Sequence, residues 1–353
     1  MKKLDKLRKQ FDHYQIDGLL ISSTYNRRYV TNFTGTAGVA LISADKAMFI
    51  TDFRYTEQAE KQAKDFHIVQ HSGSLIKEVA EKVKELGIRK LGFEQDHMPY
   101  AIWHEYKEAV DAELVPVSNC IENMRLIKTN DEIGVIKEAA DIADAAFKHI
   151  TEFIKPGLTE LDVANELEFF MRKCGATSSS FDIIVASGVR SALPHGVATD
   201  KIIELGDMIT LDFGALHKGY VSDITRTVAV GEPSAQLKEV YDVVLEAQLH
   251  AMEQIKPGMT GIEADALARD IIAAKGFGKQ FGHSLGHGIG LEVHEGPGLS
   301  FRSKVKLEKG MVVTVEPGIY LPGIGGVRIE DDIVITETGN ETLTHSTKNL
   351  LIL

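Results

Sequence analysis

Short apolar runs alternate with segments of helical spacing along about the first 120 of the 353 residues. Runs of aliphatic and β-branched residues are typical of buried strands, whereas apolar positions three and four apart indicate helices. The strand-like runs are 18–22, 38–43, 47–51, 68–69 and 90–93, and the helix-like segments are 4–14, 56–64 and 75–86. This order predicts a small α/β domain with a mixed sheet over residues 1–123.

The pattern changes after residue 123, where a long amphipathic helix follows a short join. Thr129 and Glu132 have the spacing of a capping box, in which two side chains satisfy backbone N–H groups at the start of a helix. We therefore assign residues 124–353 to a second domain.

This second domain contains an internal repeat. The hexapeptide IKPGLT at 154–159 returns as IKPGMT at 255–260, an offset of 101 residues. Each copy follows a long helical segment, opens a second helix with a capping box, and is followed by a glycine where that helix would stop. The capping pairs are Thr159 with Asp162 and Thr260 with Glu263, and the glycines are Gly175 and Gly276. The repeat predicts an α+β domain with a pseudo-two-fold axis and a site on that axis.

Four acidic residues interrupt the strand-like runs of the two repeats. Asp212 in the run 206–214 aligns with Glu316 in 310–318, and Asp223 approximately matches Glu330. A single acid of this kind would ordinarily face solvent from an edge strand, but carboxylates are depleted from strands and costly to bury. The two nearby cations, Arg226 and Arg328, are too few to neutralise four converging acids. Bound divalent cations would compensate the charge directly.

Histidines are concentrated near these acids. His283 and His287 lie in the glycine-rich segment GHSLGHGIG at 282–290, His294 follows, and His195 lies upstream of Asp212. The segment lacks the glutamate of a His-Glu-x-x-His zinc helix. A lone histidine is most often a hydrogen-bonded structural residue, but two of them among four glycines favour a ligand site, because glycines let a ligand come close.

Composition and charge narrow the classes of protein. The chain has 44% hydrophobic and 25% charged residues, which is ordinary for a globular protein. Its net charge of −12 argues against a nucleic-acid partner, since such surfaces require clustered cations. We expect no signal peptide and no membrane span, because no apolar run is long enough. Cys120 and Cys174 have no metal-like spacing, which favours free thiols in a reducing, cytoplasmic compartment.

Five ordered motifs resemble the pita-bread metallopeptidases, and among them the Xaa-Pro peptidases, prolidase and aminopeptidase P. The motifs are LDFG at 211–214, SDITRT at 222–227, GHGIG at 286–290, VEPG at 315–318 and GVRIED at 326–331. The resemblance covers residues 124–353, and the amino-terminal domain is similar in kind. It implies a pita-bread catalytic domain preceded by a creatinase/prolidase-like domain.

The resemblance also implies a ligand set for two divalent metal ions. Asp212 would bind one metal, His287 and Glu316 would hold the other, and Asp223 and Glu330 would bridge the pair. Oxygen-rich sites of this type favour Mn²⁺, with Co²⁺ and Zn²⁺ as alternatives.

Further roles follow from the same resemblance. Glu316 would relay a proton to the departing proline nitrogen, and His294 would hydrogen-bond the developing oxyanion. His195 and His283 would line the pocket beside the scissile bond. Arg328, which immediately precedes the Ile329-Glu330 pair, would either bind substrate or orient the Glu330 carboxylate.

The expected reaction is hydrolysis of the bond between a first residue and a following proline, in a dipeptide or a longer peptide. Several prolidases carry an arginine where this chain has Gly298, an arginine suited to gripping a dipeptide carboxylate. The compact length favours a dipeptidase, with aminopeptidase P as the alternative. Family members of this size are commonly homodimers, and we expect the same here.

Three rival interpretations remain within this fold. A creatinase-like hydrolase needs no metal, and an inactive peptide-binding or protein-binding module loses ligands, whereas all five ligand positions are filled here. Methionine aminopeptidase shares the ligands but typically lacks the preceding α/β domain. Metal analysis and the turnover of Met-Ala against Ala-Pro would separate these possibilities.

Overall fold

The computed structural model describes residues 2–353 and divides into two compact units. The first unit ends at Arg125 and the second runs Leu126–Leu353. The sequence pattern placed this boundary between residues 123 and 124. Each unit has its own hydrophobic cores and is described by itself.

The first unit is built on a six-stranded sheet with the order β4-β3-β2-β1-β5-β6. Strand β2 pairs antiparallel with β1 and with β3, while the other neighbours are parallel, so the predicted mixed sheet is confirmed. The strands are β1 (Gly18–Ile21), β2 (Val39–Ser43), β3 (Ala47–Thr51), β4 (His67–Gln70), β5 (Lys90–Glu94) and β6 (Glu113–Val117). The helices are α1 (Lys3–Arg8), α2 (Phe11–Tyr14), α3 (Thr24–Thr31), α4 (Thr56–Gln62), α5 (Leu75–Glu85), α6 (Tyr100–Ala109) and α7 (Cys120–Arg125).

The second unit contains two helix pairs that begin and end alike. They are α8 (Asn130–Phe153) with α9 (Glu160–Lys173) and α10 (Ala235–Gln254) with α11 (Gly261–Ala274). Both partners of the predicted capping boxes hydrogen-bond as expected at the starts of α8, α9 and α11. Gly175 and Gly276 adopt φ of +107° and +91° directly after the cap residues of α9 and α11, a conformation that residues with a Cβ disfavour. The internal repeat is therefore visible in the backbone.

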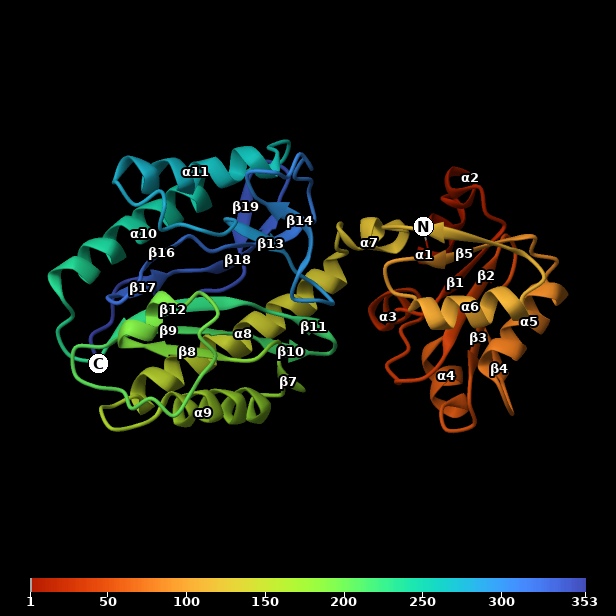
Figure 1. The fold of residues 1–353 in the computed structure, drawn as a ribbon, viewed down its shortest axis with the longest axis horizontal. Coiled ribbons are helices and arrows are strands. Elements are labelled where there is room, and N and C mark those ends of the chain that lie inside the picture. The colour runs from red at the N-terminus through yellow and green to blue at the C-terminus, as the bar shows by residue number, and fades with distance from the viewer. Residues whose placement is uncertain (1) are drawn as a thin grey trace. The chain divides into compact units, whose positions relative to one another are not determined.

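Each helix pair packs on the strands of its own half, and in Figure 1 the strands lie between the two pairs. The first half contributes β7 (Ser178–Ser179), β8 (Ile184–Ser187), β9 (Met208–Phe213), β10 (Ala215–His217), β11 (Tyr220–Val221) and β12 (Ile224–Ala229), with the 3₁₀ helix η1 (Gly188–Ala192) after β8. The second half contributes β13 (Gly286–Gly288), β14 (Glu295–Leu299), β15 (Val312–Val315), β16 (Gly318–Leu321), β17 (Gly325–Arg328), β18 (Asp331–Ile335) and β19 (Asn340–Thr342).

Equivalent antiparallel pairs form the centre of each half. Strand β9 pairs with β12 so that Asp212 lies opposite Thr225, and β15 pairs with β18 so that Val315 lies opposite Asp331. The acidic residues of the two halves therefore lie in, or directly beside, paired strands. Within residues 2–353, no helix is both long and apolar enough to cross a membrane.

Candidate metal centre

One large cavity of the second unit collects the predicted acids and the predicted histidines. Its volume is about 560 Å³. Asp212 comes from β9, Asp223 precedes β12, Glu316 follows β15, and Glu330 lies between β17 and β18. The imidazole of His287 enters from β13. All five predicted ligands thus line the same cavity.

The side-chain atoms of these residues approach one another closely. The His287 Nε2 atom lies 3.4 Å from Glu316 Oε1 and 3.8 Å from Asp223 Oδ2. Asp223, His287 and Glu330 each present one ligand atom, and these three atoms all lie within 4.8 Å of one another. Spacing of this order is what ligands of a shared cation require.

Burial and mutual repulsion shift the protonation of the acids. Burial, followed by the charges of Glu330 and Asp212, raises the pKa of Asp223 well above its usual range. Burial, followed by the charges of Glu316 and Asp212, does the same to the pKa of Glu330. The pKa of Glu316 rises to about 8, chiefly because of burial, although Arg328 opposes the shift. Protein groups alone do not neutralise this cluster.

The residues present fit divalent metal ions. The Oδ1 atoms of Asp212 and Asp223 are buried and have no hydrogen-bond partner within residues 2–353. A buried acceptor without a partner is costly, and a cation would satisfy both atoms. Burial, followed by the nearby His294, lowers the pKa of His287 to about 4, so its imidazole is neutral and can act as a ligand near pH 7. Four carboxylates and one neutral imidazole form an oxygen-rich donor set.

Arg328 is the one lysine or arginine among the described residues that line the cavity. Its guanidinium donates to Asp212 Oδ2, to Tyr320 Oη at 2.7 Å and to Thr225 Oγ1 at 3.2 Å. Arg328 makes no direct hydrogen bond to the Glu330 carboxylate among residues 2–353; that carboxylate accepts from Thr225 Oγ1 at 2.6 Å, and Thr225 in turn accepts from Arg328. Arg328 ends β17 in the second half of the repeat, and its contact with Asp212 reaches β9 in the first half.

The remaining predicted histidines also line the cavity. His195 and His294 are exposed, and the His294 ring lies 4.4 Å from the His287 ring. His283 Nε2 lies 2.9 Å from Tyr320 Oη, and burial, with Arg328 and other cations, lowers the pKa of His283 to about 4.

The sequence patterns did not predict the roles of two residues that hold this site. Tyr320 connects Arg328 with His283, and Thr225 connects Arg328 with Glu330. Thr225 lies in one of the recognised motifs, so its position was visible although its role was not. Tyr320 lies in an ordinary apolar strand, and no pattern in the sequence marks it.

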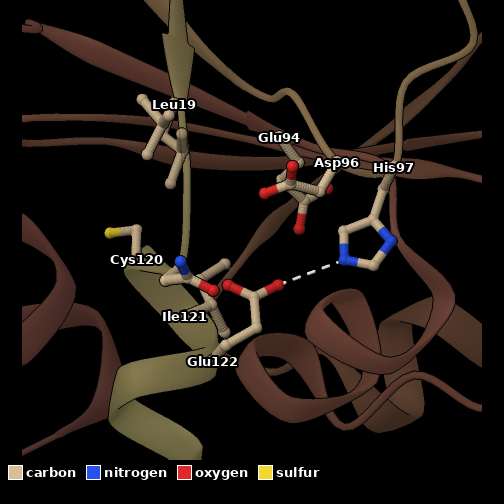
Figure 2. Close-up of a pocket in the computed structure, with 9 residues that line it drawn as sticks. Leu19, Glu94, Asp96, His97, Cys120, Ile121 and Glu122 are labelled. Atoms are coloured by element: carbon tan, nitrogen blue, oxygen red, sulfur yellow. Dashed lines mark hydrogen bonds and ion pairs between the residues drawn. The ribbon is translucent and has the colours of Figure 1, made fainter. Parts of the chain in front are cut away.

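The first unit contains a different, much smaller pocket, shown in Figure 2. Its volume is about 10 Å³, which is room for one water molecule at most. Its acids already have partners: Glu94 accepts from the backbone N–H groups of Ser22 and Ser23, and Glu122 pairs with His97 at 3.2 Å. This pocket therefore does not resemble the cavity of the second unit.

A duplicated fold that pools four carboxylates and an imidazole in one cavity defines a metal-dependent hydrolase. Residues 134–337 match the sequence model of metallopeptidase family M24, and residues 3–127 match the creatinase/prolidase N-terminal domain. The chain belongs to metallopeptidase family M24, and the fold predicted from the sequence is confirmed.

Similar proteins cover almost the whole chain. A solved structure of an Xaa-Pro dipeptidase from Bacillus anthracis is 66% identical, has a TM-score of 0.99 and covers 99% of both chains. An Xaa-Pro dipeptidase from Pyrococcus horikoshii is 43% identical over 99% of this chain and 99% of its own length. A solved structure of an X-Pro aminopeptidase from Thermotoga maritima is 43% identical, with a TM-score of 0.92, and covers 98% of this chain and 100% of its own.

Proposed function

We propose that this protein is an Xaa-Pro dipeptidase, a prolidase that hydrolyses the bond between a first residue and a following proline. The observation that carries the proposal is the convergence of Asp212, Asp223, His287, Glu316 and Glu330 in one cavity. Relatives named Xaa-Pro dipeptidase, similar over nearly their full length, support the substrate class.

The five residues would hold two divalent ions, with Mn²⁺ favoured by the oxygen-rich donor set. Asp212 would bind one ion, His287 and Glu316 the other, and Asp223 and Glu330 would bridge them. The unpartnered Oδ1 atoms of Asp212 and Asp223 support this assignment. When bound, such ions supply a water of lowered pKa and polarise the peptide carbonyl.

The protein's own residues would handle the protons and the substrate. Glu316 would accept a proton from the attacking water and pass it to the proline nitrogen as the C–N bond breaks. The exposed imidazole of His294 would donate a hydrogen bond to the developing oxyanion. His195 and the neutral His283 would position the substrate beside the scissile bond.

Arg328 would act through Asp212 and Tyr320. Its side chain is 4% exposed, and its guanidinium already donates to Asp212, Tyr320 and Thr225. We therefore assign Arg328 to holding Asp212 in place, in preference to the substrate-binding role predicted from the sequence.

A proline substrate is chemically distinct because the scissile bond is a tertiary amide without an N–H group. The protein therefore cannot use that N–H for recognition and must recognise the ring and the flanking groups. Aminopeptidase P activity on longer peptides is the second candidate function. It is favoured by Gly298, which lines the cavity without a side chain that could grip a dipeptide carboxylate, and by the name of the Thermotoga maritima relative.

One assay tests both candidates. Mn²⁺-loaded protein would be given Ala-Pro and Ala-Pro-Ala in parallel, with Met-Ala as a control. We expect Ala-Pro to be cleaved with the higher kcat/KM. Preferential cleavage of Ala-Pro-Ala would establish the aminopeptidase instead, preferential cleavage of Met-Ala would indicate a methionine aminopeptidase, and no cleavage of any peptide would overturn the proposal.

We further propose a cytoplasmic homodimer that binds peptides and not nucleic acid. Cys120 and Cys174 are free thiols, as a reducing compartment allows, and the net charge of −12 disfavours nucleic acid. The 73% exposed side chain of Phe53 is of the kind that subunit contacts cover. Sedimentation equilibrium would determine the oligomeric state.

A further inference from the structure

A fully buried glutamate holds the loop that carries His195. Glu160, the first residue of α9, is 0% exposed. One of its carboxylate oxygens accepts from the Ser187 backbone N–H at 2.8 Å and hydroxyl at 2.9 Å. The other accepts from the Thr199 backbone N–H at 3.1 Å and hydroxyl at 2.7 Å. The Glu160 carboxylate therefore joins the two ends of the segment 187–199 through hydrogen bonds.

Arg190 completes this arrangement from within the same segment. Its Nε donates to Glu160 Oε2 at 3.0 Å, and its Nη2 donates to the Val197 carbonyl at 2.8 Å. His195 lies in the turn that Arg190 spans, next to the cavity-lining Val197. We name Glu160 and Arg190 the first clamp.

The second half of the repeat holds the His283 segment in a comparable way. Asp265 of α11 is 1% exposed, binds Arg269 at 2.6 Å and accepts from the Leu285 backbone N–H at 3.0 Å. Arg269 then donates to the carbonyls of Phe281 at 3.0 Å and His283 at 2.7 Å. We name Asp265 and Arg269 the second clamp.

We infer that each clamp positions one substrate-facing histidine, His195 by the first and His283 by the second. Both histidines lie outside the helices and strands, where backbone position is otherwise weakly determined. Active-site geometry tolerates only small displacements, so such segments require tethers. Each clamp joins a buried acid on the second helix of a pair to an arginine whose side chain is 24% exposed. The expected effect of the clamps on catalysis rests on the proposed peptidase function, whereas their effect on the backbone of the two segments does not.

Arginine-to-lysine variants test the clamps with little risk to folding. Arg190→Lys and Arg269→Lys keep the charge, but a lysine cannot reach the carboxylate and a backbone carbonyl with the fork that arginine provides. Arg172→Lys is the matched control, because Arg172 is a 53% exposed arginine on α9 that pairs with Glu168. Arg172 also donates to the Thr177 carbonyl at 2.6 Å, so Arg172→Lys should alter exchange only near residue 177 and leave 187–199 and 281–285 unchanged.

The first measurement is amide hydrogen exchange by mass spectrometry, which needs no activity. Arg190→Lys should speed exchange in 187–199 and leave 281–285 unchanged, and Arg269→Lys should do the reverse. Unchanged exchange in the matching segment of either variant would overturn the corresponding clamp.

The second measurement is a crossed double-mutant cycle on Ala-Pro hydrolysis. Arg190→Lys should lower kcat/KM about tenfold in the wild-type background, a typical effect of losing a supporting interaction. The loss should nearly vanish in His195→Ala and persist in His283→Ala. For Arg269→Lys, the loss should nearly vanish in His283→Ala and persist in His195→Ala. Equal losses in both histidine backgrounds would overturn the positioning role. A wild-type protein that cleaves no Xaa-Pro peptide would instead refute the proposed function. In that case, hydrogen exchange alone would decide whether the clamps exist.

Discussion

Glu330 and Asp331 are neighbours in the chain, and their pKa values move in opposite directions. Both are buried, at 2% and 0% exposure. The pKa of Glu330 rises because of burial and the nearby acids Glu316 and Asp212. Burial alone would also raise the pKa of Asp331, but Arg226 and Lys348 outweigh it and lower that pKa.

The contacts of the two residues explain the difference. Asp331 accepts from Arg226, Lys348 and Gln248, each at 2.7 Å, so its negative charge is compensated inside the protein. Glu330 accepts from Thr225 Oγ1 and faces the cavity with the other acids. Asp331, whose charge two cations compensate, belongs to the scaffold, whereas Glu330, which meets other acids, indicates that a cation from solution binds there.

Substitution of a cavity acid should have the largest effect on activity. Asp223→Asn removes one proposed bridging ligand and also one of the mutually repelling charges. We expect kcat/KM on Ala-Pro to fall more than about a thousandfold, because metal activation supplies several kcal/mol to the reaction. The metal-free variant should melt at least as high as the metal-free wild type. Metal content and kcat/KM would be measured together, and full activity would contradict the proposed site.

Substitution of the adjacent scaffold acid should act mainly on stability. Asp331→Asn leaves the charges of Arg226 and Lys348 uncompensated in the interior. We expect the free energy of unfolding to fall by about 3 kcal/mol, as when one partner of a buried ion pair is removed. Chemical denaturation of the metal-free proteins would measure this loss. An unchanged free energy of unfolding would show that the contrast between the two acids is wrong.

Acids that line the cavity could be predicted from the sequence, whereas the buried acids of the scaffold could not. Asp212 and Glu316 could be found because each acid interrupts an apolar strand at a matched position of the repeat. Glu330 and Asp331 look alike in the sequence, since their partners lie far away in the chain and meet them only in the folded protein. Glu160 follows the capping residue of its helix, a position where acids ordinarily face solvent, so its burial could not be predicted.

The same physics explains why the partner of Arg328 was missed. An arginine two residues before Glu330 could reach that neighbour, or it could reach across to the other half of the repeat. The choice depends on the twist and pairing of β9, β12 and β17, which local periodicity does not determine. The repeat and the five proposed ligands that line the cavity could be predicted from the sequence, whereas the hydrogen-bond network behind them required the fold.

The pH dependence of the metal-free protein offers a third comparison. The pKa of Glu316 is raised from 4.5 to about 8, so the folded state binds more protons than the unfolded state between these values. Stability should therefore decrease as pH rises from about 7 to 8, by roughly 1 kcal/mol, whereas below about pH 6.5 the lowered pKa values of His283 and His287 make stability rise with pH. Added Mn²⁺ should stabilise the protein more at pH 8 than at pH 5. Melting temperatures of the metal-free protein that rise between pH 7 and pH 8 would contradict the raised pKa of Glu316.

The smallest expected effect concerns the hydroxyl that supports Glu330. Thr225→Val keeps the branched shape that suits β12. It removes the hydroxyl that donates to Glu330 and accepts from Arg328. We expect kcat/KM to fall about tenfold with an almost unchanged melting temperature, because losing a partner behind a ligand typically costs 10- to 100-fold. Thr210→Val is the control: Thr210 is equally buried on β9, and its hydroxyl has only a 3.5 Å contact with Thr227. Equal losses of kcat/KM in both variants would mean that Thr225 contributes packing alone. A loss confined to Thr225→Val would show that Glu330, a cavity acid without a direct cationic partner, depends on a neutral hydroxyl for its orientation.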